Sequence, residues 1–398
     1  MSTTSLRVTI LNWRDLSHPE GGGSERYVER VAAGLAAAGC DVVLQCSRVD
    51  GAPRTQRRDG YLIRRAGGRL GVYPAALAAL LRDRLRGRGP QVVLEVQNGL
   101  GFYSRLVAGC PVVVLVHHVH REQWPIALGP WAARFGWWTE SRLAPRLHRG
   151  CQYVTVSGVS KHQLTQLGVR AGDIAVVRNG LDPVPPGVAE ASGTTDSPEA
   201  PQLAVLGRLV PHKRVEHALE VLARLLPDHP GLRLHVIGDG WWHPQLTAHV
   251  EQLGVRDAVT FHGFVSDIDK HRLLAGCQLL LAPSVKEGWG LMVVEAAQHG
   301  VPAIAYRHAG GLAESIHDGL TGLLVDDLDE LVDQTRALLA DAARRRALGE
   351  NARLASGDHT WAAASTAILT LLRRAASGRP ATDRPEVAEP LGSAAGLL

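Results

Sequence analysis

Two glutamates that bracket a glycine-containing loop form the most informative pattern in this chain. Glu287 opens the run, Gly288 and Gly290 follow it, and Glu295 closes it after seven intervening residues. Glycine has no side chain, so backbone amides in such a loop can approach a ligand closely. A helix that begins at about Leu291 would add unpaired amides and a partial positive charge, which suit a diphosphate. With a carboxylate on either side of this anion-binding loop, the pattern predicts a site that binds a nucleotide-sugar.

A pair of cations points to the same ligand. Arg208 and Lys213 directly follow an apolar strand expected over residues 203–206. Only four of the 43 basic residues are lysine, which makes a lysine at such a position more informative than usual. Positive charge there would offset the negative charge that develops on a departing diphosphate. A surface basic loop is the alternative interpretation.

Apolar runs alternate with helical patterns along most of the chain, which predicts parallel sheets covered by helices on both faces. We expect strands at residues 6–11, 41–46, 91–96, 112–116 and 153–156, and a second series at 203–206, 232–237, 259–261, 278–282, 301–306 and 322–325. Helices are expected over residues 25–38, 215–226, 244–253 and 361–375, and from about Leu291 onward. The fold class is therefore α/β, with two doubly wound Rossmann-like lobes and an inter-lobe cleft as the default site for two substrates.

The lobes have the following expected boundaries. Residues 1–182 form the N-terminal lobe, 183–201 a linker rich in Pro, Gly, Ser and Thr, and 202–358 the C-terminal lobe. Residues 359–376 should form a terminal helix that packs back toward the N-terminal lobe, followed by a disordered tail at 377–398.

Composition favours a globular enzyme and excludes a membrane-spanning one. The 398 residues are 45% hydrophobic and 21% charged, and no apolar run approaches the ~20 residues that span a bilayer. Residues 1–182 hold 24 Lys and Arg against 13 Asp and Glu, while residues 183–398 hold 19 against 26. The basic half can face an anionic acceptor or a membrane, or can be a solvated surface. We expect a cytoplasmic protein, with peripheral contact at the inner face of the plasma membrane left open, and no nucleic-acid partner.

The spacing of Glu287 and Glu295, together with Arg208 and Lys213, resembles the donor site of bacterial family-4 retaining glycosyltransferases, with actinobacterial-like composition. The resemblance covers nearly the whole chain to about residue 375 and implies the two-lobed GT-B fold. It implies transfer of a hexosyl unit from a nucleoside diphosphate sugar to an acceptor hydroxyl with retained configuration, in the biosynthesis of polysaccharides, other glycans, glycolipids or glycosylated metabolites. It also implies a nucleotide-sugar site in the C-terminal lobe and an acceptor side in the N-terminal lobe. No cofactor and no metal are implied, because cationic side chains take the metal's place.

The resemblance also assigns roles to individual residues. His117, Arg208, Lys213 and Glu287 are expected to be catalytic, with Glu287 on the sugar and Glu295 on the ribose. Further donor contacts are expected at Gly22, Gly23, Gly238, Val265, Gly288, Trp289, Gly290, Leu291 and Glu295. His118 is the alternate sugar contact, because the neighbouring histidine leaves the register open by one residue. The glycine loop at Gly22 lacks the dinucleotide-binding pattern, and no acidic residue ends the second strand, which disfavours an NAD enzyme.

Two other classes remain open: a sugar-nucleotide epimerase or hydrolase on the same fold, and an inactive sugar-nucleotide-binding scaffold. A tryptophan-rich stretch at residues 123–148, which also holds Arg134, Arg142 and Arg146, is either core and acceptor-pocket wall or an interfacial membrane contact. The donor base, the sugar, the acceptor, the linkage and the oligomeric state are not specified by these patterns.

Overall fold

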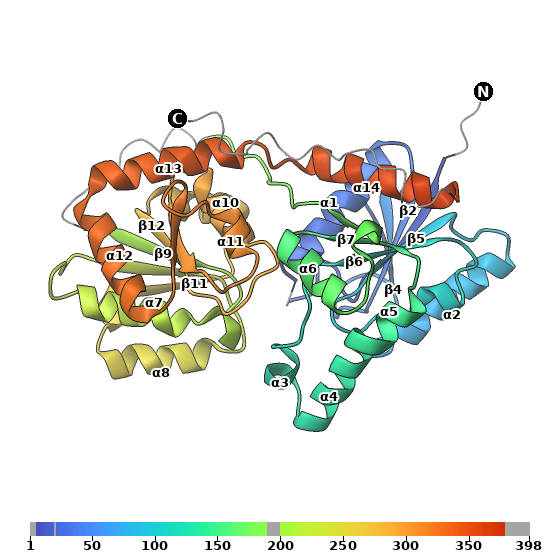
Figure 1. The fold of residues 1–398 in the computed structure, drawn as a ribbon, viewed down its shortest axis with the longest axis horizontal. Coiled ribbons are helices and arrows are strands. Elements are labelled where there is room, and N and C mark those ends of the chain that lie inside the picture. Colours follow the sequence, from blue (N-terminus) through green and yellow to red (C-terminus); the bar gives the residue numbers. More distant parts are fainter. Residues whose placement is uncertain (1–4, 20, 189–199, 379–398) are drawn as a thin grey trace. The chain divides into compact units, whose positions relative to one another are not determined.

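Two predominantly parallel sheets organise the chain, one in each of two units (Figure 1). The computed structural model describes residues 5–19, 21–188 and 200–378. The first unit comprises Met1–Gly180 with Thr360–Leu398, and the second comprises Leu181–His359. Each unit surrounds its sheet with its own helices, as predicted for doubly wound lobes.

The sheet of the first unit has eight strands in the order β3-β4-β2-β1-β5-β6-β7-β8. These strands are β1 (Arg7–Leu11), β2 (Asp41–Cys46), β3 (Thr55–Arg58), β4 (Tyr61–Arg65), β5 (Val92–Val96), β6 (Val112–Val116), β7 (Gln152–Thr155) and β8 (Ile174–Val176). Strands β5 and β6 are buried along their whole length. Continuous apolar runs of this kind are typical of parallel strands covered on both faces.

One edge of this sheet departs from the prediction of purely parallel strands. Strand β3 pairs antiparallel with β4. Their connection is a two-residue turn in which Asp59 and Gly60 both have positive φ, 45° and 83°. Such a turn matches the twist of a tight hairpin. Charged and polar residues on β3 are also typical of an edge strand.

The helices of the first unit include the last helix of the chain. They are α1 (Gly23–Ala37), α2 (Val72–Leu85), α3 (Trp124–Ala127), α4 (Pro130–Trp138), α5 (Ala144–Leu147), α6 (Gly158–Gln166) and α14 (Trp361–Ala376). Helix α14 begins at the capping residue Thr360, whose side chain accepts a hydrogen bond from Ala363 N. It packs against α1 so closely that a Cβ on Gly34 would lie 2.2 Å from Ser365 Oγ. A glycine at this crossing lets the two helix backbones approach.

The sheet of the second unit has six parallel strands in the order β11-β10-β9-β12-β13-β14. They are β9 (Gln202–Leu206), β10 (Arg233–Ile237), β11 (Val259–Gly263), β12 (Leu279–Ala282), β13 (Ala303–Tyr306) and β14 (Gly322–Val325). Counted within this unit, the order is 3-2-1-4-5-6, the arrangement of a dinucleotide-binding fold. The strand order therefore reverses between β9 and β12, where such folds bind ligands.

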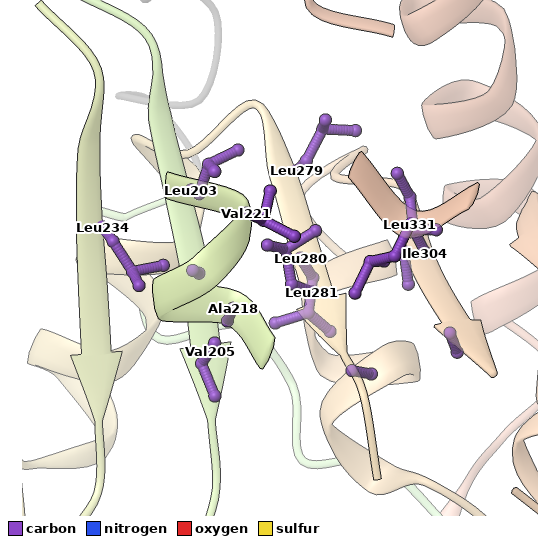
Figure 2. Close-up of a cluster of buried hydrophobic side chains, with 14 of the residues drawn as sticks. Leu203, Val205, Ala218, Val221, Leu234, Leu279, Leu280, Leu281, Ile304 and Leu331 are labelled. Carbon is purple, nitrogen blue, oxygen red and sulfur yellow. The ribbon is translucent and has the colours of Figure 1, made fainter. Parts of the chain in front are cut away.

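Apolar side chains of β9, β10, β12, β13 and the surrounding helices form the core of this unit (Figure 2). The helices are α7 (Val215–Leu225), α8 (His243–Leu253), α9 (Asp267–Ala275), α10 (Leu291–Ala297), α11 (Leu312–Ser315), α12 (Leu328–Ala340) and α13 (Ala342–Ser356). Leu203, Leu280 and Ile304 are completely buried at the centre of this cluster. A rigid core at the middle of the sheet fixes the loops that leave its carboxyl edge.

Most of the segments expected to connect or extend the lobes lie outside the described residues. These are residues 189–199 of the expected linker and 379–398 of the expected tail. Before this gap, residues 183–188 of the expected linker end in a turn in which Val188 is fully buried and its amide donates to Pro185 O. The boundary between the units falls at Gly180 and Leu181, and the second boundary at His359 and Thr360.

Candidate functional site

A pocket lies at the point of the second sheet where the strand order reverses. Its walls come from the ends of β9 and β12 and from the loops that follow them. The lining residues are Val205, Leu206, Gly207, Arg208, Lys213, Val215, Leu281, Ala282, Pro283, Ser284 and Met292. The structure thus brings the predicted cations Arg208 and Lys213 together with the loop that leads to Glu287.

Lys213 and Glu287 form an ion pair at this pocket, between Nζ and Oε1. Lys213 ends a short 3₁₀ turn, Pro211–Lys213, after β9, and Glu287 lies in the loop after β12. The two loops are also joined through the backbone, because Val285 N donates to His212 O at 2.8 Å. Both side chains are mostly buried, so their attraction is screened less than that of a surface pair. The arrangement holds a cation and a carboxylate side by side.

The loop that carries Glu287 is fixed by the loop after β13. Glu287 N donates to Ala309 O, and Gly311 N donates to Glu287 O, both at 2.9 Å. A Cβ on Gly311 would lie 2.2 Å from Gly288 O, so only glycine permits this approach. Gly290 has φ +83° and precedes α10, whose first residue is the half-buried Leu291. The backbone from Gly288 to Leu291 is therefore held in one conformation before any ligand arrives.

Two further observations qualify the predicted anion-binding loop. Helix α10 is only seven residues long, so its dipole contributes less to the positive potential of the site than the nearby side-chain cations. The indole of Trp289 is buried and packs edge-on against His359, with ring centroids 5.4 Å apart. The backbone of Trp289, and not its side chain, is therefore available to contact a nucleotide-sugar. Arg208, in contrast, is exposed at the mouth of the pocket.

Glu295, the second glutamate of the pattern, lies on α10 and is held by a lysine. Lys270 Nζ on α9 lies 2.8 Å from Glu295 Oε1 and 3.0 Å from Asp267 Oδ1. Lys270 was not singled out from the sequence, although it is one of the four lysines. The rarity of lysine was the available signal, but the partner becomes visible only when α9 and α10 are packed together.

The carboxyl ends of β10 and β11 carry the other predicted donor contacts. Gly238 has φ +132°, and a Cβ there would lie 2.0 Å from Gly207 O, which makes this position accessible only to glycine. Gly238 N donates to Gly263 O at 2.9 Å. Val265 follows in the loop to α9 and is half-buried against the core. Its neighbour Phe264 is 87% exposed and was not singled out from the sequence.

In the first unit, the predicted glycine loop ends at the start of α1. Gly22 is the capping residue of α1, and its amide donates to Glu25 Oε2 at 2.8 Å, while Gly23 is the exposed first helical residue. Glu25 is buried and forms an ion pair with Arg14 at 3.1 Å. Burial alone would raise the pKa of Glu25, but Arg14 and the Gly22 amide hold that pKa below its ordinary value. A charged Glu25 thus fixes the end of the loop.

His117 and His118 follow β6 but have different environments. His117 is buried, and its ring meets Tyr27 edge-on at 5.2 Å. Burial lowers the pKa of His117 to about 4, so the imidazole is neutral at pH 7. Among the described residues, none makes a hydrogen bond to the buried Nε2 of His117. His118 is half-buried, and its Nε2 lies 3.0 Å from Gln123 Oε1.

The buried carboxylate of Glu140, close to these histidines, was not predicted from the sequence. Glu140 accepts hydrogen bonds from His120 N and from Trp124 Nε1, at 3.1 and 2.7 Å, and lies 3.0 Å from His120 Nδ1. It belongs to a π-helical turn, Thr139–Leu143, between α4 and α5. An extra residue in a turn re-aims side chains, and such turns occur frequently at functional sites. Within the described part of the chain, no group of three or more His, Cys, Asp or Glu residues has an arrangement that could hold a metal ion.

Comparison with known proteins accounts for both units. The model described as "Glycosyltransferase Family 4" matches residues 21–184, and the model described as "Glycosyl transferases group 1" matches residues 192–355. A glycogen synthase of Mycobacterium tuberculosis is 30% identical over 94% of this chain and 96% of its own length. Another curated relative, an exopolysaccharide phosphotransferase of Streptomyces coelicolor, is 35% identical, but the match spans 47% of this chain and only 19% of that protein.

Solved structures share the fold at lower identity. A sucrose-phosphate synthase from Thermosynechococcus elongatus has a TM-score of 0.79 at 20% identity, covering 94% of this chain and all of its own. Anabaena HepE in complex with UDP-glucose has a TM-score of 0.70 at 19% identity, covering 92% of this chain and 99% of its own. The near-complete match to a curated glycosyltransferase, both domain models and the GT-B neighbours agree. This chain therefore belongs to the glycosyltransferases, with a domain that matches the family-4 model followed by one that matches the group 1 model, and has the GT-B fold.

Proposed function

We propose that this glycosyltransferase moves a hexosyl unit from a nucleoside diphosphate sugar to an acceptor hydroxyl and retains the anomeric configuration. The observation that carries the proposal is the Lys213–Glu287 pair beside Arg208 at the switch point of the second sheet. It combines two cations suited to a leaving diphosphate with a carboxylate suited to sugar hydroxyls. The complex of the structural neighbour HepE with UDP-glucose adds support for this class of donor.

In the proposed reaction, the bond between the sugar's anomeric carbon and the diphosphate oxygen breaks, and a bond from that carbon to the acceptor oxygen forms. The acceptor's proton passes to the departing diphosphate. Arg208 and Lys213 stabilise the charge that develops on this group, which is the preorganised electrostatic effect that dominates many such reactions. We propose that no metal and no cofactor are needed, because these two side chains and the amides of residues 288–291 supply the positive potential.

The remaining residues divide between the parts of the donor. Glu287 is assigned to the sugar and Glu295 to the ribose, while Gly238 and Val265 face the base. In the first unit, the unsatisfied and neutral Nε2 of His117 is suited to a sugar hydroxyl. The bond between His118 and Gln123 makes His118 the weaker candidate.

Nucleotide release from UDP-, GDP- and ADP-sugars, with and without an acceptor library, tests the reaction class. Release that requires an acceptor supports a transferase, and product mass spectrometry then identifies the acceptor. Release without an acceptor would indicate a hydrolase, and binding without turnover would indicate a scaffold. The anomeric proton coupling of the product, measured by NMR, tests retention. An inverted product would contradict that part of the proposal.

Calorimetric titration separates the roles of the two glutamates. Glu295→Gln should weaken binding of the free nucleoside diphosphate, because a ribose hydrogen bond loses its charge. Glu287→Gln should weaken binding of the intact donor without weakening that of the free diphosphate, because Lys213 loses its carboxylate partner and stays available to the phosphates. Equal losses of diphosphate affinity in both variants would show that this division of roles is wrong.

The acceptor side is proposed from a line of exposed aromatic residues on α4. Trp131, Phe135 and Trp138 are 81, 63 and 48% exposed and recur at helical spacing. Exposed Arg142 and Arg146 continue along the same helical run through α5. The one acidic residue among residues 130–147 is Glu140, which is buried. Figure 1 shows α4 extending away from the sheet of its unit.

This surface is suited to peripheral contact with an anionic membrane. Aromatic rings favour the headgroup level, and arginines attract acidic lipids. Within residues 5–19, 21–188 and 200–378, no helix is long and apolar enough to span a bilayer. Cosedimentation with anionic and neutral vesicles across a salt series tests the contact, since the Debye length falls from ~10 Å at 0.1 M to ~3 Å at 1 M.

The matched variants are a Trp131→Ser, Phe135→Ser double substitution and Leu85→Ser, which changes a 79% exposed side chain on α2 of the same unit. Only the double variant should lose binding to anionic vesicles. Negligible wild-type binding to both vesicle types would remove the membrane contact and favour an acceptor in solution.

A further inference from the structure

Lys270 is a nearly buried ammonium group that joins two helices of the second unit. Its Nζ lies 2.8 Å from Glu295 Oε1 on α10 and 3.0 Å from Asp267 Oδ1 on its own helix, α9. Lys270 is 8% exposed. An ammonium loses its hydration when it is buried, so it requires oppositely charged partners. Both partners here are carboxylates.

The two partners are not equivalent. The Asp267 side chain is 51% exposed and lies three residues before Lys270, the spacing of a helix-surface pair. Such exposed pairs contribute little to stability. The Glu295 side chain is only 16% exposed and comes from a different helix. A lysine that served only to pair with Asp267 could remain in solvent, so the burial of Lys270 follows from its reach toward Glu295.

We propose that Lys270 is a positioning residue for the ribose of the nucleotide, acting by holding the carboxylate of Glu295. This inference rests on the proposed function, in which Glu295 binds the ribose. An ionised carboxylate has about four acceptor sites, and the bond to Lys270 uses one of them. A glutamate side chain fixed in this way binds a ribose diol without first losing its rotamer freedom.

The helix that carries Lys270 is also tied to the proposed base contact. Helix α9 begins immediately after Ser266, whose side chain accepts a hydrogen bond from Asp269 N at 3.1 Å. The preceding loop holds Val265 and the exposed Phe264. Helix α9 therefore connects the loop proposed to contact the base with Lys270, which holds the Glu295 carboxylate proposed to bind the ribose. Lys270 would in this way affect recognition of the nucleotide.

This role predicts a particular kinetic signature. A contact made equally to the bound donor and to the transition state changes KM and leaves kcat nearly unchanged. Lys213 and Arg208, which face developing charge, should instead change kcat. A lysine with only a structural role would alter the unfolding temperature but not the preference for ribose over deoxyribose.

The test measures that preference directly. Wild type, Lys270→Met, Glu295→Gln and the double variant are titrated calorimetrically with UDP, GDP and ADP and with the 2′-deoxy form of each. Lys161→Met is the matched control, because Lys161 lies on α6 of the other unit. Since a hydrogen bond to a charged group contributes roughly tenfold or more in affinity, wild type should prefer the ribonucleotide by about tenfold. Lys270→Met should lower this preference at least threefold, and the control should keep it.

The outcomes separate this inference from the function on which it rests. If Glu295→Gln loses the ribose preference and Lys270→Met keeps it, the positioning role is wrong and the ribose role of Glu295 stands. If wild type shows no preference, or Glu295→Gln keeps it, the ribose role itself is wrong and the inference falls with it. Lys270→Gln serves if the methionine variant does not fold, because it keeps a polar head, and the same preference decides the result. In the double variant the loss should equal that of Glu295→Gln alone.

Discussion

Replacing Lys213 and Glu287, singly and together, probes the ion pair at the centre of the proposed donor site. The two side chains are 17 and 14% exposed and bonded to each other, so neither acts independently. Lys213→Met removes the cation that faces the leaving diphosphate and also releases Glu287 from its partner. Glu287→Gln removes the sugar-binding charge and leaves Lys213 without its carboxylate.

The expected size of each effect follows from this geometry. Removing one preorganised group from a developing charge costs about 3 kcal/mol, or roughly a hundredfold in kcat. Independent effects would multiply to about ten-thousandfold in the double variant. Groups in direct contact instead show interaction energies of about 0.5–3 kcal/mol. We therefore expect the double variant to lose between about a hundredfold and a few thousandfold in kcat, less than the product of the two single losses.

The assay is the steady-state rate of nucleotide release in the presence of the identified acceptor. Circular dichroism and thermal unfolding establish that each variant is folded, and Lys161→Met provides the control for loss of a lysine elsewhere. A wild-type kcat in Lys213→Met would refute the leaving-group role. Fully multiplicative losses in the double variant would show that the ion pair does not act as a unit.

Three further predictions concern the loops and the histidines. Gly290→Ala should lower the free energy of unfolding by about 2 kcal/mol in chemical denaturation, because φ is +83° and the new Cβ would lie 2.4 Å from Leu312 Cδ2. Gly300→Ala has φ +68° but its nearest atom at 3.8 Å, so it should lower the free energy of unfolding by only about 1 kcal/mol. Equal losses of stability in the two variants would contradict the steric reasoning. Phe264→Ala should weaken nucleoside diphosphate binding by roughly 1 kcal/mol, or about fivefold, if its exposed ring stacks on the base, and unchanged calorimetric affinity would exclude that contact. Burial, then His271 and Lys270, lower the pKa of His299 to about 4 from 6.5. The unfolded chain therefore binds a proton between pH 6.5 and 4 that the folded chain does not, so stability should fall as pH is lowered through this window and be fully present above it. The unfolding temperature of His299→Gln should depend less on pH across the same window, and an unchanged slope would rule out His299 as a source.

The sequence predicted most of the parallel strands because their signal is local. The strands at residues 41–46, 112–116 and 322–325 have the predicted bounds, and the other predicted strands and helices begin and end within two residues of them. Continuous apolar runs bounded by polar loops mark strands that are buried on both faces. The order of those strands, which creates the switch point between β9 and β12, was not predicted, because a local apolar pattern does not specify which strands pair.

The hairpin β3–β4 was not predicted because its arginines are typical of a solvent-exposed segment. Each strand ends in two arginines, yet Arg65 is buried in an ion pair with Asp15, which is distant in sequence. That pairing turns an apparently solvated segment into part of the fold. The adjacent Asp59 and Gly60, a strong hairpin-turn signal, could have revealed it.

The site was partly predictable for the same physical reason. Arg208, Lys213 and Glu287 follow predicted strands, so placing the strand ends at one sheet edge also places these side chains together. Lys270 is paired with Glu295 on another helix, and Glu140 is bonded to His120 in the loop after β6 and to Trp124 on α3. No local pattern specifies such pairs, because helix packing decides which side chains meet. The burial of the Trp289 indole likewise depends on His359, which lies 70 positions later.

A crystal structure of the protein with a bound nucleoside diphosphate would show directly where the nucleotide binds. We predict that the diphosphate lies against Arg208, Lys213 and the amides of residues 288–291, with the ribose hydroxyls on Glu295. We also predict that Lys213 turns at least partly from Glu287 toward the phosphate oxygens. A nucleotide bound away from the β9–β12 switch point, or a ribose that makes no contact with Glu295, would contradict these predictions.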